Sequence, residues 1–510
     1  MTSSMAELPA QYGAPNPQAV TTPSRPISPM NAIGEGATPL MYACQQSRDQ
    51  DVRRILAKKP EAAKERDRTM KTALHYCAES ASLTCADIFL SVAADLVDAR
   101  DEDGYTPLHL AVIAGNRPLI KFLLSKNADV NSLDYERHSV VHWATVCGEV
   151  EALELVLDAG ANPSTPDIHG GYPVHYAAQM CGPNSEMGND VRFGLAVLRK
   201  LLARGVEVNV RDKDGRQPIL WAASADSTSS ASCPSGSADA ILALVNAGAN
   251  VEADDKDGLT ALHCAASRGH TDCIETLVTL CGAEVDVIDS NGCTALFYAV
   301  TLGHADSTQL LLNFGAEPDR QDRKGRTPAH CGAAKGQLET LRILGTHGAN
   351  LWVRNVRGDY PLHEAVVSGR KNLVYWLLTQ RPDAVNSPNN DGRCPLHIAA
   401  VNNNVEMCKI LLDNQALLNP VMRTSKGQLM TPIDAALHRG NRGCAKYLQL
   451  HGGVPASKLT DKSARVRGGN QRSVARKSGD EFKHYEMMHC FNSKSVSVHR
   501  IRTTRIFRKP

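Results

Sequence analysis

The sequence lacks a long apolar run. None of its 510 residues lie in a stretch approaching the roughly 18 consecutive apolar residues that a transmembrane helix needs. Its first residues, MTSSMAELPAQYGAPNPQ, also lack the basic and then apolar order of a secretory signal. We therefore expect an intracellular chain without a transmembrane segment.

Closely paired cysteines are missing as well. The 15 cysteines form no C-x-x-C motif, and residues such as Cys77, Cys147 and Cys264 stand alone in alanine-rich segments. This pattern argues against a disulfide framework and favours buried thiols in a reducing compartment. The sequence contains no N-glycosylation acceptor, because Asn162 is followed by proline. Both absences agree with a cytoplasmic or nuclear location.

The short motifs of common enzymes are absent. We find no phosphate-binding G-x-x-x-x-G-K-[ST] loop, no H-E-x-x-H zinc motif and no G-x-S-x-G nucleophile motif. We therefore predict a non-catalytic protein with no cofactor. Reproducible turnover by the purified protein would overturn this prediction.

A short apolar motif recurs through most of the chain, usually 33 or 34 residues apart, as independent domains have no reason to do. Its twelve copies begin at Thr38, Thr72, Thr106, Ser139, Tyr172, Gln217, Thr260, Thr294, Thr327, Tyr360, Cys394 and Thr431. Threonine or serine caps a helix, and proline suits the first helical position. Glycine ends the short helix, a second amphipathic helix follows, and an Asp-Gly hairpin turn precedes the next copy. Each unit is therefore predicted to be turn, helix, turn and helix.

The motif Thr106-Pro107-Leu108-His109-Leu110-Ala111 carries the T-P-L-H-x-A signature, so the chain resembles the ankyrin-repeat family. The resemblance implies an all-α solenoid of about twelve repeats over residues 33–454, with one continuous apolar core. It also implies protein partners. Residues 1–32 are proline-rich and predicted to be a disordered leader.

The segment after the array is basic. Residues 457–510 hold 14 Lys and Arg against 4 Asp and Glu, and we predict that 455–510 form a disordered tail. Ser473 and Ser478 follow basic residues and are phosphorylation candidates. The tail's charge suggests contact with nucleic acid, an acidic membrane surface or the acidic array, whereas plain disorder is the alternative.

A histidine recurs in most units, but it does not indicate a metal site. Ligands lie about 2 Å from zinc, whereas successive units are spaced about 10 Å apart, so these rings cannot share an ion. We predict no metal, and expect each ring to bond to nearby backbone. The histidines are His75, His109, His142, His175, His263, His330, His363 and His397.

Large aromatic residues follow this histidine in three successive units, at Trp143, Tyr176 and Trp221. The family's inner helices line a concave face, so one hypothesis is that these rings, with Tyr105, anchor a protein partner. The alternative is that they pack between neighbouring inner helices. Two longer units carry extra residues near 180–194 and 226–239, which would form one protruding binding surface or be tolerated insertions.

Charge changes sign along the hairpins. The tip before the third unit reads DARDED, whereas the tip before the ninth reads RQDRKGR. Arg323, Arg326, Arg357 and Arg393 are therefore candidates for docking an acidic partner segment, with solvated charge as the alternative. On this hypothesis, reversing the charge of the first three weakens partner capture without lowering the melting temperature.

These observations predict a non-catalytic cytoplasmic scaffold or adaptor whose concave surface binds proteins. The alternative is a nuclear regulatory cofactor whose basic tail contacts nucleic acid or an import receptor. Deleting residues 457–510 separates the two, because only the second needs the tail for nuclear residence.

Overall fold

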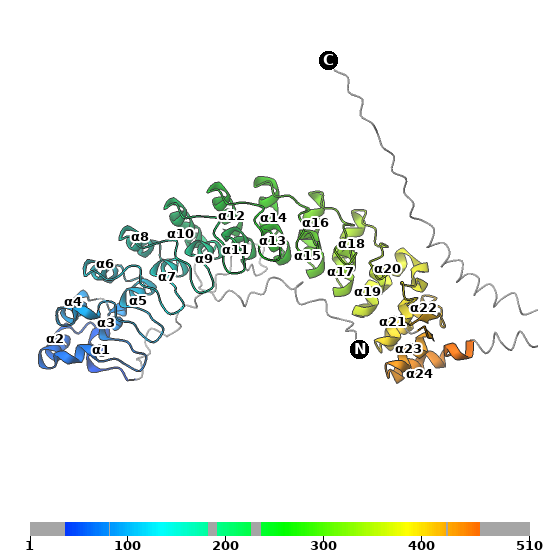
Figure 1. Cartoon of the computed structure of the whole chain (residues 1–510), viewed down its shortest axis with the longest axis horizontal. Helices are drawn as coiled ribbons and strands as arrows, with labels where there is room; N and C mark the ends of the chain where they lie inside the picture. The colour runs from blue at the N-terminus through cyan, green and yellow to red at the C-terminus, as the bar shows by residue number, and fades with distance from the viewer. Residues whose placement is uncertain (1–35, 81, 182–190, 226–235, 425–426, 460–510) are drawn as a thin grey trace, which may run out of the picture.

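The computed structural model describes residues 36–80, 82–181, 191–225, 236–424 and 427–459. Within these ranges, 24 α-helices form twelve consecutive pairs, each with an inner helix directly after one recurring motif and an outer helix behind it. Figure 1 shows the pairs stacked side by side in an arc, with the outer helices along the convex side and the inner helices toward the concave side. This arrangement confirms the predicted helical solenoid.

The helices range from 4 residues in α3 to 13 residues in α10. The inner helices are α1 (Pro39–Gln45), α3 (Ala73–Tyr76), α5 (Pro107–Ile113), α7 (Val140–Val146), α9 (Pro173–Gln179), α11 (Pro218–Ser224), α13 (Ala261–Arg268), α15 (Ala295–Leu302), α17 (Pro328–Lys335), α19 (Pro361–Ser368), α21 (Pro395–Val401) and α23 (Pro432–His438). The outer helices are α2 (Asp49–Lys58), α4 (Leu83–Val92), α6 (Arg117–Ser125), α8 (Val150–Asp158), α10 (Val191–Ala203), α12 (Gly236–Asn246), α14 (Thr271–Glu275), α16 (Ala305–Asn313), α18 (Leu338–Thr346), α20 (Lys371–Gln380), α22 (Val405–Asp413) and α24 (Arg442–Leu450).

Shorter elements complete the chain. The 3-10 turns are η3 (Pro60–Lys64), η4 (Cys77–Glu79), η5 (Ala94–Leu96) and η7 (Pro382–Asn386), and a π-helical turn, η6 (Thr276–Leu280), extends α14. The strands β1 (Met422–Arg423) and β2 (Leu429–Met430) pair antiparallel in the last hairpin.

The recurring motif caps several of the inner helices as the sequence predicts, although Gln217 and Thr294 make no side-chain cap bond at the starts of α11 and α15. In α5, the Thr106 side chain accepts the backbone N–H of His109, and Pro107 occupies the first helical position. At the other end, Gly269 and Gly303 adopt left-handed backbone angles, with φ of 77° and 86°, and stop α13 and α15. The same local chemistry therefore starts and ends helices along the arc.

One apolar core runs the length of the array. A single cluster of buried side chains extends from Leu40 in α1 to Leu448 in α24, because each unit packs its apolar faces against both neighbours. Thirteen cysteines lie in the described part of the chain, and all but the half-buried Cys281 are buried there as free thiols. The predicted continuous core is confirmed.

Several predicted segments lie outside the described residues. These are the leader, nearly all of the tail with Ser473 and Ser478, and most of the two insertions, which fall between α9 and α10 and between α11 and α12. Among the described helices, none combines the length and apolar character needed to cross a bilayer.

Candidate functional site

The hairpins between units form a continuous edge beside the inner helices. The backbone N–H of Tyr135 donates to the carbonyl of Asp103 at 3.0 Å, and the N–H of Lys213 donates to the carbonyl of His169 at 2.9 Å. Equivalent bonds join each described hairpin tip to the one before it. The donors are Glu102, Tyr135, Ile168, Lys213, Lys256, Ser290, Arg323, Val356, Asn390 and Arg423. Side chains on neighbouring tips are therefore held in fixed register.

A carboxylate or amide closes every described hairpin except the last, where Thr424 Oγ1 accepts from the Gln428 N–H. The Oδ1 atom of the carboxylate or amide accepts the backbone N–H four residues later, as when Asp134 accepts from His138 at 2.7 Å. The residues that do this are Asp67, Asp101, Asp134, Asp167, Asp212, Asp255, Asp289, Asp322, Asn355 and Asn389. These side chains hold the backbone of each hairpin in its turn conformation.

The predicted aromatic anchors belong to this internal framework. Trp143, Tyr176 and Trp221 are only 2%, 1% and 4% exposed, so they do not form a surface strip. Each ring donates to the second oxygen of a hairpin aspartate nine residues earlier, as in Trp143 to Asp134 at 3.1 Å and Trp221 to Asp212 at 2.9 Å. The alternative, packing between inner helices, is the arrangement observed, because the rings carry a polar atom that the buried aspartates need.

Tyr105 also packs inward. Its half-buried ring meets Trp143 edge to face, with centroids 5.3 Å apart. Burial raises the pKa of the Tyr105 phenol. The role of this residue as a partner anchor remains a prediction, whereas its contact with Trp143 is structural.

The third unit shows what happens when the aromatic donor is missing. Leu110 occupies that position, and Asp101 Oδ2 has no hydrogen-bond partner although it is buried. Burial raises the pKa of Asp101 to about 6. The aspartate and the aromatic residue therefore act as a pair.

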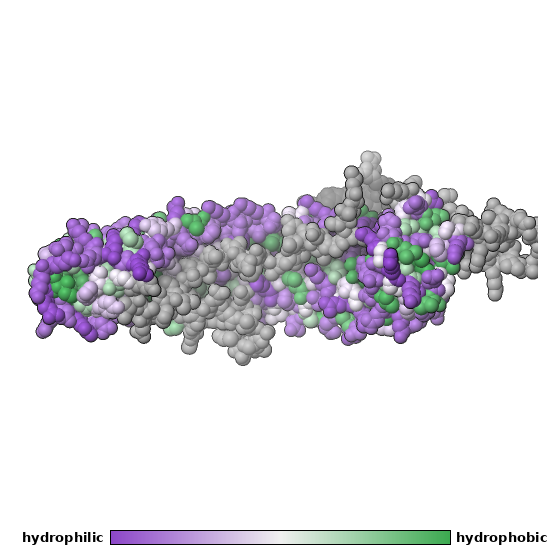
Figure 2. All heavy atoms as spheres, turned by 90° about the horizontal axis from the view of Figure 1, so that it is seen from below, coloured by the Kyte–Doolittle hydropathy of each residue, from purple (hydrophilic) through white to green (hydrophobic). Residues whose placement is uncertain are grey.

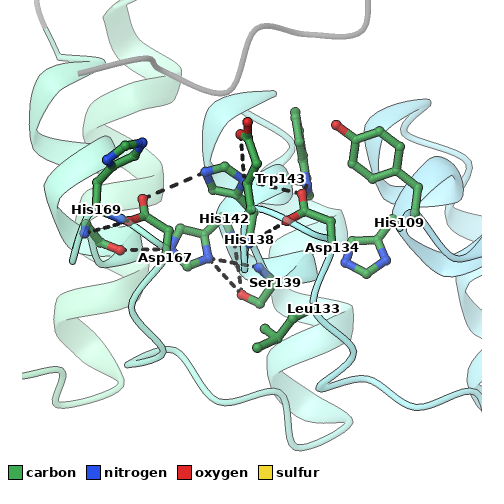
Figure 3. A network of polar contacts seen from close by, with 12 residues as sticks. His109, Leu133, Asp134, His138, Ser139, His142, Trp143, Asp167 and His169 are labelled. Carbon is green, nitrogen blue, oxygen red and sulfur yellow. Dashed lines mark hydrogen bonds and ion pairs between the residues drawn. The ribbon is translucent and has the colours of Figure 1, made fainter. Parts of the chain in front are cut away.

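A denser polar network joins the fourth and fifth units (Figure 3). Buried His138 lies between two hairpin carboxylates, with Nδ1 3.3 Å from Asp134 Oδ2 and Nε2 3.7 Å from Asp167 Oδ2. The Tyr176 hydroxyl donates to Asp167 at 2.5 Å. Burial acts to raise the pKa of Asp134, but the hydrogen bond and electrostatic attraction of His138 outweigh it, so the pKa lies below its ordinary value. His138 thus links adjacent hairpins.

The recurring histidines bond to backbone, as predicted. The N–H of Thr72 donates to His75 Nδ1 at 3.0 Å, so the ring proton is on Nε2, which donates to the Tyr105 carbonyl at 3.0 Å. Burial lowers the pKa to about 4 in His75, His109, His142, His175, His330 and His397. These rings are neutral, and all but His109, whose Nε2 has no hydrogen-bond partner among the described residues, bond to the backbone of the next unit. No cluster of three or more His, Cys, Asp or Glu suited to a metal occurs among the described residues.

The predicted basic residues of the later hairpins differ in their surroundings. Arg323 is exposed at its tip, whereas the Arg326 side chain is only 11% exposed and pairs with buried Asp322 at 2.7 Å. A charge reversal at Arg326 would place two carboxylates together, so the buried pair favours a lower melting temperature for this change rather than an unaltered one.

Arg357 and Arg393 lie farther along the same edge. The Arg357 side chain is 63% exposed and reaches Asp359 and Glu364, each at 3.1 Å. Arg393 Nε is 3.9 Å from Asp391 Oδ2, and its side chain is one-third exposed. Of the four predicted basic residues, Arg323 and Arg357 thus present the most surface.

A groove that the sequence analysis missed crosses three hairpins, in the fourth, fifth and sixth units. It is an open surface groove with a volume of about 420 Å³. Its lining residues are Arg137, Pro166, Asp167, Ile168, Gly170, Tyr172, Arg211, Asp212 and Lys213. The signal available in the sequence was Arg137, which stands where most hairpins have glycine.

Comparison with known proteins agrees with this architecture. A family model described as ankyrin repeats in three copies matches residues 24–100, 92–167, 188–285, 229–322, 277–355, 308–386 and 362–458.

The chain is also similar to parts of several longer proteins. It is 26% identical to E3 ubiquitin-protein ligase KEG of Arabidopsis thaliana over 69% of this chain and 21% of that protein. It is 32% identical to the nuclear factor NF-kappa-B p105 subunit of Gallus gallus over 35% of this chain and 16% of that protein. It is 28% identical to inversin of Homo sapiens over 49% of this chain and 19% of that protein. The chain therefore spans about a fifth or less of each relative.

Proposed function

The chain belongs to the ankyrin-repeat family, and we propose that it is a non-catalytic scaffold or adaptor that presents its concave side and hairpin edge to protein partners. Ankyrin repeats are protein-interaction modules. The proposal rests on one observation: polar side chains in the interior are already hydrogen-bonded within the array, whereas charged side chains at the hairpin edge are exposed. Histidines and aspartates inside the array bond to the array itself, whereas cations such as Arg323 and Lys213 project from the hairpin tips.

The composition of the surface favours polar contacts with a protein partner. Figure 2 shows mainly hydrophilic side chains on much of the described surface, with apolar areas most evident toward the C-terminal end. Exposed Leu429, Leu437 and Leu450 belong to that end. Along the rest of the edge, charge complementarity is the favoured basis for recognising a partner.

Rigid presentation is the proposed mechanism. The continuous core and the bonds between hairpin tips hold neighbouring units in register, so little conformational entropy remains to be lost on binding. Burial raises the pKa of Cys264, Cys273 and Cys331 to about 12, so these three thiols stay protonated at neutral pH and are poorly suited to act as nucleophiles.

The second candidate is a nuclear regulatory cofactor, favoured by the basic composition of residues 455–510. In that case the tail binds nucleic acid or an import receptor, and phosphorylation of Ser473 or Ser478 weakens the attraction. Deleting residues 457–510 abolishes nuclear residence under this proposal. A cytoplasmic scaffold keeps its location after the deletion.

Crosslinking of the full chain in cells, read by mass spectrometry, tests the scaffold proposal. The variant Arg323→Glu/Lys324→Glu reverses two exposed charges on the hairpin edge. The matched control, Lys121→Glu/Arg342→Glu, makes the same change on exposed positions of outer helices α6 and α18. Protein crosslinks to the array should fall in the first variant and persist in the control. Absence of protein crosslinks from the unaltered array would refute the proposal.

A further inference from the structure

The basic groove, named for Arg137, Arg211 and Lys213, joins the hairpins of the fourth, fifth and sixth units. Pro166, Ile168 and Tyr172 supply apolar surface between the cations. The groove has a volume of about 420 Å³ and is open to solvent along the hairpin edge.

Arg137 has an unusual backbone conformation for a residue with a side chain. Its φ is +66°, in the left-handed region that favours glycine. Glycine occupies the equivalent position, two residues before the recurring motif, in nine described units, at Gly36, Gly104, Gly170, Gly215, Gly258, Gly292, Gly325, Gly358 and Gly392. A Cβ at Gly170 would lie 2.9 Å from the backbone nitrogen of Lys213. A side chain here therefore destabilises the hairpin.

No interaction of the Arg137 side chain within the described part of the chain compensates for this destabilisation. Arg137 is exposed, and no ion pair or side-chain hydrogen bond is seen for it within the described part of the chain. Met70 is the other side chain with a positive φ at this position among the described hairpins, and it carries no charge. Strained residues often mark functional positions, and here the strained residue lines the groove.

Positive charge dominates the accessible part of the basic groove. Lys213 is exposed, and Arg211 pairs with half-exposed Asp254 at 3.2 Å. The carboxylates of Asp167 and Asp212 are 0% and 2% exposed and are held by internal hydrogen bonds. They contribute little surface to a ligand.

Two acidic side chains stand nearby on the hairpin tips. Glu136 Oε2 is 3.8 Å from His138 Nδ1, and Asp214 pairs with Arg216 at 3.0 Å. Neither lines the groove, so the groove keeps its cationic character.

We propose that the basic groove binds an acidic segment of a protein partner, with a partner carboxylate held between Arg137 and Lys213. Guanidinium groups bind carboxylates through paired, charge-assisted hydrogen bonds, which suits Arg137 to this role. The inference rests on the proposed interaction function and names the chemistry of the segment recognised.

Fluorescence anisotropy on the full chain tests the groove with a fluorescein-labelled hexaglutamate peptide as the probe. Arg137→Gly should raise the dissociation constant about fivefold, in keeping with loss of one charge-assisted contact, and should also raise the urea midpoint by removing strain. Arg137→Gly/Lys213→Gln should raise the dissociation constant at least about tenfold. Lys256→Gln is the matched control, because Lys256 is the exposed residue at the equivalent place on the next tip.

The expected pattern is specific to the groove. Lys256→Gln should change the dissociation constant less than about twofold, and hexaglutamine should not bind. Equal losses in Lys256→Gln and Arg137→Gly, no binding of hexaglutamate, or tighter binding of a thymidine oligonucleotide would overturn the proposal. A fall in the urea midpoint of Arg137→Gly would also overturn it, since Arg137 would then be structural. Each of these results leaves the cellular crosslinking test of the scaffold intact.

Discussion

Acidification should unfold the array through its recurring histidines. In the folded chain these rings are buried and neutral, with Nδ1 accepting a backbone N–H and Nε2 commonly donating to the next unit. Six of them have a pKa of about 4 because burial disfavours the charged form. A histidine in the unfolded chain has a pKa near 6.5.

The direction and size of the effect follow from these values. Because the unfolded chain binds protons first, the stability from these rings is complete above about pH 6.5 and is lost as the pH falls toward about 4. Between about pH 7 and pH 5, each ring lowers the free energy of unfolding by about 2 kcal/mol. Six rings give on the order of 11 kcal/mol. Asp101, whose pKa is raised to about 6, offsets only about 1 kcal/mol in the opposite direction.

Urea unfolding followed by circular dichroism measures this dependence at a series of pH values. The urea midpoint should fall steeply from about pH 6.5 to pH 5, with uptake of about five protons on unfolding. His397→Gln removes one buried titrating ring and should reduce that uptake by about one proton. His169→Gln is the control, because His169 is exposed on a hairpin tip.

A midpoint that stays constant or rises over this range would refute the account of the histidines as buried, neutral rings. Equal proton uptake in His397→Gln and the unaltered chain would refute the role of that ring in particular.

Three further predictions concern single side chains. Tyr298→Phe removes the donor to Asp289 Oδ2 at 2.7 Å and leaves that oxygen with the longer bond from the Asn291 amide at 3.3 Å. The change should lower the free energy of unfolding by about 1 kcal/mol in urea titrations, and no change would contradict the pairing. Leu110→Tyr should lower the pKa of Asp101, measured by NMR titration, and an unchanged pKa would show that the new hydroxyl does not reach it. Iodoacetamide should modify half-buried Cys281 before the buried cysteines of the described repeats, as peptide mass spectrometry can show; uniform labelling of the folded chain would contradict the burial.

The repeat architecture was predictable because its signals are local. The Thr-Pro start at Thr106, the glycine stop at Gly269 and the period of the motif each act within a few residues, and the structure confirms all three. Copies of the same local signals reinforce one another along the chain. The fold of a single unit would have been much harder to predict, since one unit buries its apolar face only against its neighbours.

The surface was harder to predict because burial depends on the stacked units. The sequence alone does not show whether Trp143 and Trp221 are core residues or exposed binding anchors. The structure decides this, because both rings donate to buried aspartates nine residues earlier, Asp134 and Asp212. The pairing of Arg326 with Asp322 could not be predicted either, because the sequence does not show that Asp322 is buried. The groove near Arg137 needs three hairpins at once, so only the missing glycine signalled it in the sequence.

The central claim is that the hairpin edge, rather than the aromatic column, meets the partner. Amide hydrogen exchange of the full chain with and without hexaglutamate tests it most directly. Slower exchange should appear in the hairpins at 134–138, 167–171 and 212–216, while helices α7, α9 and α11 remain unchanged. Protection confined to those helices, around Trp143, Tyr176 and Trp221, would contradict the claim.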